Sequence, residues 1–368
     1  DLARLSVVPG LIDCHSHLIG DVEGGDVAGH LGSPAREALL GAKHAAATLR
    51  AGFTTVRDVG TYRAFVDCAL RDAIDAGWVE GPRMRCAGAY VTRPGGGGEV
   101  SGDAGNLGLP DDARFGVIHT AGTVDGPAEV RRRVGAILDG GADVIKVIAT
   151  GAVLTVGTSP DVVELTEDEI RAAVEAAGER GAFVAAHAHG AAGIANAARA
   201  GVRSVEHGSL IDDAAIDAMV RHGTYLVADL YDGDFIAREG RRAGWPAETL
   251  RKNDETTDAQ RAGFRKAVEA GVRIAFGTDS GVYPHGRNAI QLAYYVRYGL
   301  SPLAAIRSAT LWAARCIGWS DRVGALEPGR LADLVAIDGD PLDDVALLER
   351  PAAVVKGGVL VGGVSAAA

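Results

Sequence analysis

The chain has 368 residues, of which 47% are apolar and 23% charged, so it can bury a substantial core and does not have the composition of a disordered protein. Its formal net charge of −11 argues against nucleic acid or an anionic membrane surface as the main partner and favours a small molecule. The four cysteines show no C-x-x-C spacing, no apolar run could span a bilayer and no secretion signal opens the chain, so we expect a cytoplasmic protein.

Short apolar, β-branched runs alternate with longer amphipathic stretches along most of the chain, a pattern typical of a parallel sheet built from βαβ units. Eight strands are predicted, at residues 6–18, 54–59, 83–90, 143–150, 183–189, 204–208, 224–230 and 273–279. Helices are predicted between them, at residues 33–51, 127–140, 166–181, 191–200, 212–223 and 245–271. Eight strands close a (β/α)8 TIM barrel, and we expect this α/β fold over residues 1–318, with an open doubly wound sheet as the rival architecture.

Two segments depart from this alternation. Residues 93–126 contain four consecutive glycines and no helical period, so we expect a long loop after the third strand. Residues 319–368 contain three short strands, at 334–337, 353–356 and 359–361, separated by glycine and proline turns. We interpret this second segment as a small β domain appended to the barrel.

Six residues lie at or near the carboxyl ends of predicted strands, where TIM barrels place their chemistry. Two of them, His15 and His17, are two residues apart on one strand and therefore point the same way. Imidazole and carboxylate donors without thiolates favour zinc, with manganese, cobalt or iron as alternatives. The six candidate metal ligands are His15, His17, Lys146, His187, His207 and Asp279.

Lys146 is the unusual member of this set. It lies inside the apolar run DVIKVI at residues 143–148, and an unpaired ammonium would be costly to bury there. The residues alone therefore require that some group neutralise Lys146.

Several motifs together resemble those of the amidohydrolase superfamily, and in particular its prolidase-like branch of Xaa-Pro and Xaa-Arg dipeptidases and ochratoxin amidohydrolases. They are VPGLIDCHSH at residues 8–17, IKV at 145–147, AHAHG at 186–190, EHG at 206–208, GTD at 277–279 and GALEPGRLADLV at 324–335. The resemblance covers nearly the whole chain.

The resemblance implies two divalent metal ions. One is bound by His15, His17 and Asp279 and the other by His187 and His207, while Lys146 reacts with CO2 to form a carbamate that bridges both. A metal-bridged hydroxide then attacks the substrate carbonyl, and Asp279 transfers its proton to the leaving amine. One metal ion with a neutral Lys146, and a role for Asp279 as a ligand only, are the alternatives.

Substrate contacts are expected from His189, which shares the face of His187, and from Tyr231, just after the seventh strand. Arg93 and His285 lie in loops on the same face and are weaker candidates for holding a carboxylate. Two features depart from the family. Residues 93–99 read RPGGGGE where relatives often carry TGGHG, and the family's N-terminal half of the β-sandwich domain is missing from the sequence.

The function that these features predict is hydrolysis of an amide C–N bond in a small, carboxylate-bearing substrate such as an N-acyl amino acid or dipeptide. The alternatives are a cyclic-amide or imidazolone hydrolase, a lactonase, esterase or phosphoesterase on the same metal centre, and a non-catalytic binding barrel. By family likeness, we also expect a homo-oligomer.

Overall fold

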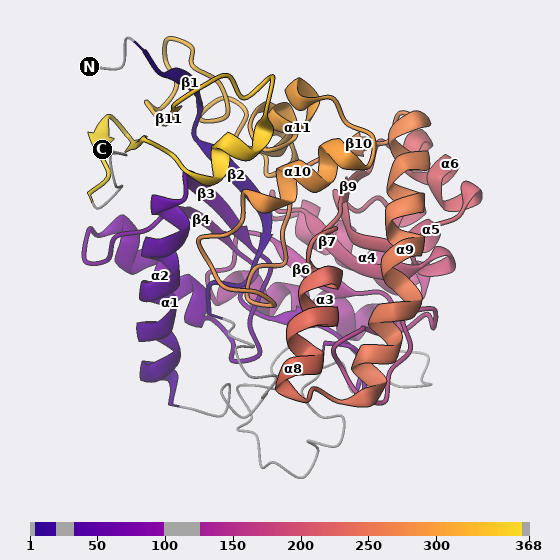
Figure 1. Ribbon diagram of the computed structural model, residues 1–368. Coiled ribbons are helices and arrows are strands. Elements are labelled where there is room, and N and C mark those ends of the chain that lie inside the picture. The colour runs from indigo at the N-terminus through magenta and orange to yellow at the C-terminus, as the bar shows by residue number, and fades with distance from the viewer. Residues whose placement is uncertain (1–3, 20–32, 99–125, 363–368) are drawn as a thin grey trace.

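The computed structural model describes residues 4–19, 33–98 and 126–362, so most of the predicted loop over residues 93–126 lies outside the described residues. A barrel of parallel strands occupies the centre of the molecule (Figure 1). In chain order these strands are β2 (Leu11–Ser16), β3 (Phe53–Asp58), β4 (Arg83–Cys86), β5 (Tyr90–Val91), β6 (Ile145–Ile148), β7 (Val184–Gly190), β8 (Ser204–Leu210), β9 (Tyr225–Val227) and β10 (Arg273–Ile274).

The third barrel position is shared by β4 and β5. Strand β4 pairs with β3, whereas β5 pairs with β6, and residues 87–89 interrupt the strand predicted at 83–90. Counted in this way, the described strands occupy the eight positions that the sequence predicts. Every pairing among them is parallel.

The first and last strand positions close the barrel. The Cys14 amide donates to the Phe276 carbonyl over 2.8 Å, and the His17 amide donates to the Ser280 carbonyl over 2.8 Å. A parallel bridge joins Ser16 to Ser280 between these two contacts. The (β/α)8 architecture predicted from the sequence is confirmed.

Strands β9 and β10 are shorter than predicted, and beyond Val227 other partners replace the ladder of β9. The Ala228 carbonyl accepts from Gln291 Nε2 and from the Tyr295 hydroxyl, both over 2.7 Å. At the end of the eighth position, Asp279 has a φ of 53°, which takes the backbone out of the extended region.

Helices cover the outside of the strands (Figure 1). The six predicted helices correspond to α1 (Pro34–Arg50), α3 (Gly126–Asp139), α4 (Glu167–Gly178), α5 (Ala191–Ala200), α6 (Asp213–His222) and α9 (Ala247–Glu269). Thr166 caps α4 in a capping box with Glu169, in which each side chain accepts from the other's backbone amide. Further α-helices, beyond those predicted, are α2 (Val66–Asp75), α7 (Asp232–Phe235), α8 (Arg241–Ala243), α10 (Ile290–Arg297), α11 (Pro302–Ser308) and α12 (Leu311–Cys316).

A separate antiparallel sheet joins the two ends of the chain. Its strands, in order, are β1 (Ser6–Pro9), β11 (Leu334–Ile337), β12 (Ala353–Lys356) and β13 (Val359–Leu360). The prediction of one strand over residues 6–18 is therefore wrong: the chain changes sheets at Gly10, whose amide donates to the Asp333 carbonyl over 2.9 Å. One strand from the N-terminal end thus belongs to a sheet that was predicted from the C-terminal segment alone.

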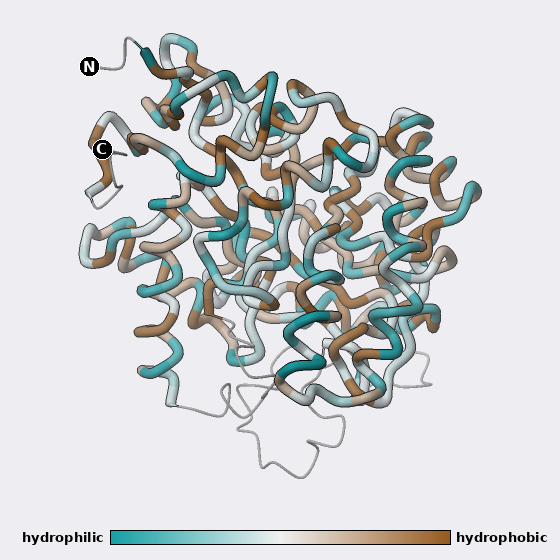
Figure 2. The backbone as a smooth tube through the Cα atoms, viewed as in Figure 1, coloured by the Kyte–Doolittle hydropathy of each residue, from teal (hydrophilic) through white to brown (hydrophobic). Residues whose placement is uncertain are grey.

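The core lies between the strands and the outer helices. Every residue of β2, β3, β6 and β7 is buried, as expected of parallel strands covered on both faces. Hydrophobic segments accordingly gather at the centre of the molecule, while the outer helices alternate hydrophobic and hydrophilic residues (Figure 2). Within the described ranges, no helix combines the length and apolar character that crossing a membrane would need.

Candidate metal centre

A pocket opens at the carboxyl ends of the barrel strands. All six candidate metal ligands line it, and so does His189. Its wall also carries apolar side chains, among them Ile148, Val153, Leu154, Ile236 and Val282. A further group of lining residues has neutral polar side chains: Thr61, Tyr62, Tyr90, Thr155, Asn253, Thr256 and Thr257.

The first cluster in this pocket joins the first and eighth strand positions. The Nε2 atoms of His15 and His17 lie 3.3 Å and 3.2 Å from the same oxygen, Asp279 Oδ1. Two imidazoles and one carboxylate therefore converge on one point, as the alternation of side chains along the first strand predicted. Burial raises the pKa of Asp279, but the two neighbouring imidazoles outweigh this and hold it well below its ordinary value.

Other contacts of the two imidazoles orient them. His15 Nδ1 lies 3.0 Å from Glu206 Oε2, and His17 Nδ1 lies 2.7 Å from the Gly60 carbonyl oxygen. Both partners are acceptors, so each Nδ1 carries a proton, and Nε2 is the nitrogen left to bind a metal ion. Metal-binding histidines are commonly oriented by such contacts.

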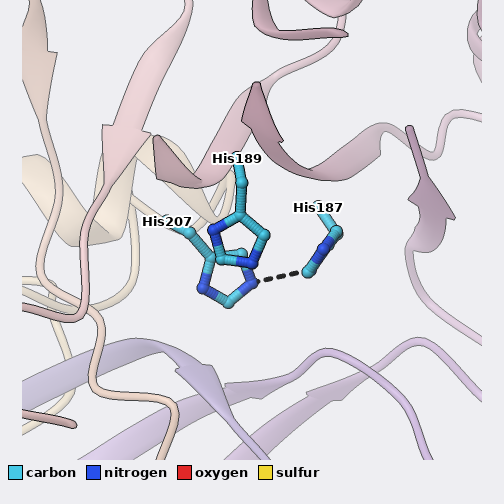
Figure 3. Close-up of side chains that lie close together, drawn as sticks. All are labelled: His187, His189 and His207. Atoms are coloured by element: carbon cyan, nitrogen blue, oxygen red, sulfur yellow. Dashed lines mark hydrogen bonds between the residues drawn. The ribbon is translucent and has the colours of Figure 1, made fainter. Parts of the chain in front are cut away.

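The second cluster consists of His187, His189 and His207, which come from β7 and β8 (Figure 3). His187 Nδ1 lies 2.8 Å from His207 Nε2, and the rings of His189 and His207 stack with centroids 4.6 Å apart. His207 Nδ1 lies 2.7 Å from Asp229 Oδ2, so the orientation of His207 repeats that of His15. Burial and the neighbouring imidazoles lower the pKa of His187 well below its ordinary value, which favours the neutral form that binds metals.

The two clusters meet. The ring centroids of His15 and His207 lie 4.8 Å apart, and donor atoms of His15, His207 and Asp279 all lie within 4.8 Å of one another. His207 also belongs to the group with His187 and His189. A set of converging nitrogen and oxygen donors at this spacing fits one or two divalent cations of the zinc type.

Lys146 lies on β6 at the base of the pocket and is only 2% exposed. Within residues 4–19, 33–98 and 126–362, no carboxylate forms an ion pair with its ammonium group. Burial lowers the pKa of Lys146 to about 8, against the opposing influence of Glu206 and Asp279. More of this amine is therefore neutral near pH 7 to 8 than in an exposed lysine, and the neutral amine is the form that can react with CO2.

Backbone conformation is unusual at two of the candidate ligands. His207 and Asp279 have φ angles of 69° and 53°, in the left-handed region that residues other than glycine seldom adopt. Strained backbone of this kind collects at functional sites, where the surrounding structure holds it in place. The Asp279 amide is held by the His15 carbonyl over 2.9 Å, which ties one candidate ligand to another.

Three residues expected to contact substrate lie elsewhere. Tyr231 does not line the pocket but packs in an aromatic cluster, with its ring centroid 4.9 Å from that of Tyr283. Arg93 donates to both oxygens of Glu169 over 2.8 Å. His285 Nε2 lies 3.2 Å from the His17 carbonyl oxygen, outside the lining of the pocket. Of the four expected substrate contacts, His189 alone reaches the pocket wall.

Several charged residues at the site were not predicted from the sequence. Glu206 and Asp229 orient His15 and His207, Arg57 pairs with Glu206 over 2.7 Å, and Asp232 lines the pocket. Glu206 could have been predicted, because it directly precedes His207 on a buried strand, where an acidic residue needs a partner. The partners themselves are far apart in the sequence, 191 residues in the case of His15 and Glu206.

Residues 6–361 match the model of the amidohydrolase family. Ochratoxinase from Aspergillus niger is 34% identical over 372 aligned positions, which cover 96% of this chain and 75% of that protein. Imidazolonepropionase from Erwinia tasmaniensis is 26% identical and covers 91% of this chain and 79% of its own length.

Solved structures of similar fold are also found among dipeptidases of this kind. A Xaa-Pro dipeptidase with methionine bound in its active site superposes with a TM-score of 0.89 at 38% identity, over 97% of this chain and 87% of that one. A prolidase complexed with N-methylphosphonate-L-proline superposes with a TM-score of 0.88 at 32% identity, over 98% of this chain and 88% of that one. The resemblance expected from the motifs therefore extends over the whole fold.

Proposed function

This chain belongs to the amidohydrolase family and is a hydrolase of C–N bonds; from that membership we propose that it cleaves the amide of a small, carboxylate-bearing substrate, an N-acyl amino acid or dipeptide, with the help of two divalent metal ions. Zinc suits the imidazole and carboxylate donors. The observation that carries the proposal is the convergence of His15, His17, His187, His207 and Asp279 on one pocket above Lys146.

The two clusters suggest how the metal ions would be held. His15, His17 and Asp279 would bind one ion, and His187 and His207 the other. Lys146 Nζ would add to the carbon of CO2 and lose one proton, which gives a carbamate with two oxygens for the two ions. When bound, the ions would supply a water of lowered pKa and polarise the scissile carbonyl.

Asp279 is suited to moving a proton in this reaction. Both imidazole contacts use its Oδ1, and among the described residues no hydrogen bond engages Oδ2. Oδ2 would take the proton of the attacking water and then deliver it to the nitrogen of the leaving amine. His189 would hold the substrate, because Ser209 Oγ binds its Nδ1 over 2.7 Å and leaves Nε2 for contact.

The pocket walls suggest how a substrate is oriented. The apolar side accepts a hydrophobic side chain or acyl group, while the polar side, which includes Thr61 and Asn253, would face the polar end of the substrate. Relatives named as ochratoxinase and Xaa-Pro dipeptidase support amide substrates of this size. The similarity to imidazolonepropionase favours a second candidate, the opening of a cyclic amide in the same pocket.

The proposal is tested by metal analysis of the purified protein and a screen of N-acyl amino acids, dipeptides and cyclic amides. We expect about two zinc ions per chain and release of an amine, with kcat reduced roughly 10²- to 10⁴-fold in Asp279→Asn. Asp254→Asn is the matched control, since Asp254 lies on the exposed surface and pairs with Arg241. Undiminished turnover in Asp279→Asn, or release of alcohols instead of amines, would overturn the proposal.

A further inference from the structure

Five arginines gather at the amino-terminal end of the barrel, opposite the candidate metal centre. Arg203 directly precedes β8, Arg273 begins β10, and Arg85 lies on β4. Arg315 comes from α12, and Arg322 follows shortly after it. The chain as a whole carries a net charge of −11, so a concentration of positive charge here needs an explanation.

These arginines are not neutralised by acidic neighbours. Within residues 4–19, 33–98 and 126–362, none of the five forms an ion pair, although most other arginines of the described surface do. Asp143, the carboxylate that acts on Arg85, is itself engaged by Arg71 over 2.7 Å. Burial lowers the pKa of Arg85, and the charges of Arg322 and Arg203 contribute in the same direction.

Aromatic rings hold the guanidinium groups in place. Arg85 lies over Phe183 and Trp319, at 5.3 Å and 5.0 Å from the ring centroids, and Arg203 also lies over the Phe183 ring, 5.0 Å from its centroid. Arg273 lies 5.8 Å from the centroid of the Tyr225 ring. Cation–π contacts of this kind position each cation without consuming its charge or most of its N–H donors.

The surface between these side chains is hollowed. One hollow is lined by Arg203, Arg273 and Arg315 together with His222 and Ser320, and an adjoining one by Val272, Ile274 and Trp312. Tyr225, Arg273 and Arg315 line both. The two hollows are therefore halves of one depression: both contain Arg273 and Arg315, the cationic half adds Arg203, and the aromatic half adds Val272, Ile274 and Trp312.

We propose that this depression binds a small multivalent anion, a phosphate-bearing molecule with a flat apolar group, between Arg203, Arg273 and Arg315. Guanidinium groups pair with phosphate oxygens through two parallel N–H donors, and three of them around one hollow suit a multivalent anion better than a monovalent one. The indole of Trp312 provides the surface on which a planar group would stack. The anion would relieve the repulsion among the cations, so binding would stabilise the fold.

The experiment uses the full chain with inorganic phosphate, pyrophosphate and adenosine monophosphate as probes, at constant ionic strength set with sodium chloride. Tryptophan fluorescence reports binding at the depression, because Trp312 lines it. We expect saturable binding that raises the unfolding midpoint, with pyrophosphate and adenosine monophosphate at least several-fold tighter than phosphate. Binding of adenosine monophosphate no tighter than that of phosphate would overturn the role of the aromatic half.

The matched variants are Arg273→Gln and Arg315→Gln, with Arg251→Gln as the control of equal charge change. Arg251 is exposed on α9 and pairs with Glu255 over 2.8 Å, away from the depression. We expect each of the first two changes to weaken pyrophosphate binding ~10-fold or more, the control to leave it unchanged, and Arg315→Lys to restore part of it. Non-saturable binding, or equal affinity in all variants, would overturn the proposal.

Discussion

Glu206 illustrates how one buried residue serves two partners. Its Oε2 faces His15 Nδ1 over 3.0 Å, while its Oε1 accepts from Arg57 over 2.7 Å. Burial alone would raise the pKa of this carboxyl, but Arg57 and His15 outweigh it and hold the pKa well below its ordinary range. Glu206 therefore stays ionised and keeps the proton of His15 on the nitrogen away from the pocket.

Replacing Glu206 tests that role. In Glu206→Gln the amide can donate to His15 Nδ1, so His15 loses its preference for presenting a lone pair at Nε2. We expect zinc affinity to fall roughly 10- to 100-fold, measured by competition with a chelator. Glu175→Gln is the control, because Glu175 is exposed and pairs with Arg131. Near-UV circular dichroism identifies the folded fraction, and unchanged zinc affinity in that fraction would contradict the prediction.

At the scale of elements, the barrel depends on close contacts between neighbouring strands. Gly277 lies where the eighth strand position passes the first, and a Cβ there would come within 2.3 Å of Val227 Cγ1 and 2.8 Å of His15 Cβ. Glycine is thus required at this position because a larger residue would not fit, and not because the chain turns there. By contrast, a Cβ added at Gly178, the last residue of α4, would meet nothing within 4 Å.

Alanine at these two glycines should have opposite effects. Gly277→Ala should reduce the free energy of unfolding by about 1–3 kcal/mol, since the strands must separate to admit the methyl group. Gly178→Ala should raise it by about 0.5–1 kcal/mol, because alanine loses less backbone entropy in a helix. Urea denaturation checks both values. Equal stability of the two variants would show that the contact at Gly277 does not constrain the strands.

At the scale of the whole molecule, stability should depend on pH through a buried carboxyl that joins two loops. Both oxygens of Glu164 accept from the Gly97 amide over 2.9 Å. Burial raises the pKa of Glu164 from 4.5 to about 7, with Gly97 and Arg93 opposing the shift. Between pH 4.5 and about 7, Glu164 is therefore protonated in the folded state but ionised in the unfolded state.

It follows that Glu164 lowers the stability of the folded state as pH rises from 4.5 to 7. In Glu164→Gln, which can still accept from Gly97, this loss should disappear. The difference in unfolding free energy between variant and wild type should then grow by roughly 1–3 kcal/mol across that range. Denaturation at several pH values measures it, and a difference independent of pH would count against a raised pKa at Glu164.

From the sequence alone, the barrel and the convergence of the candidate ligands at one end of it could be predicted. Burial and alternation along each strand are local properties, and parallel strands bring their carboxyl ends to one face, so His15, His187 and Asp279 were expected together. The change of sheets at Gly10 could not be predicted, because it depends on a distant partner strand near residue 335.

Only the tertiary structure decided which charges meet. Glu206 reaches His15, Arg93 is engaged by Glu169, and Tyr231 turns into an aromatic cluster instead of the pocket. The arginines at the opposite end are also brought together from distant parts of the chain. The physical reason is the same in each case: a local pattern determines the direction and burial of a side chain, whereas barrel closure determines its neighbours.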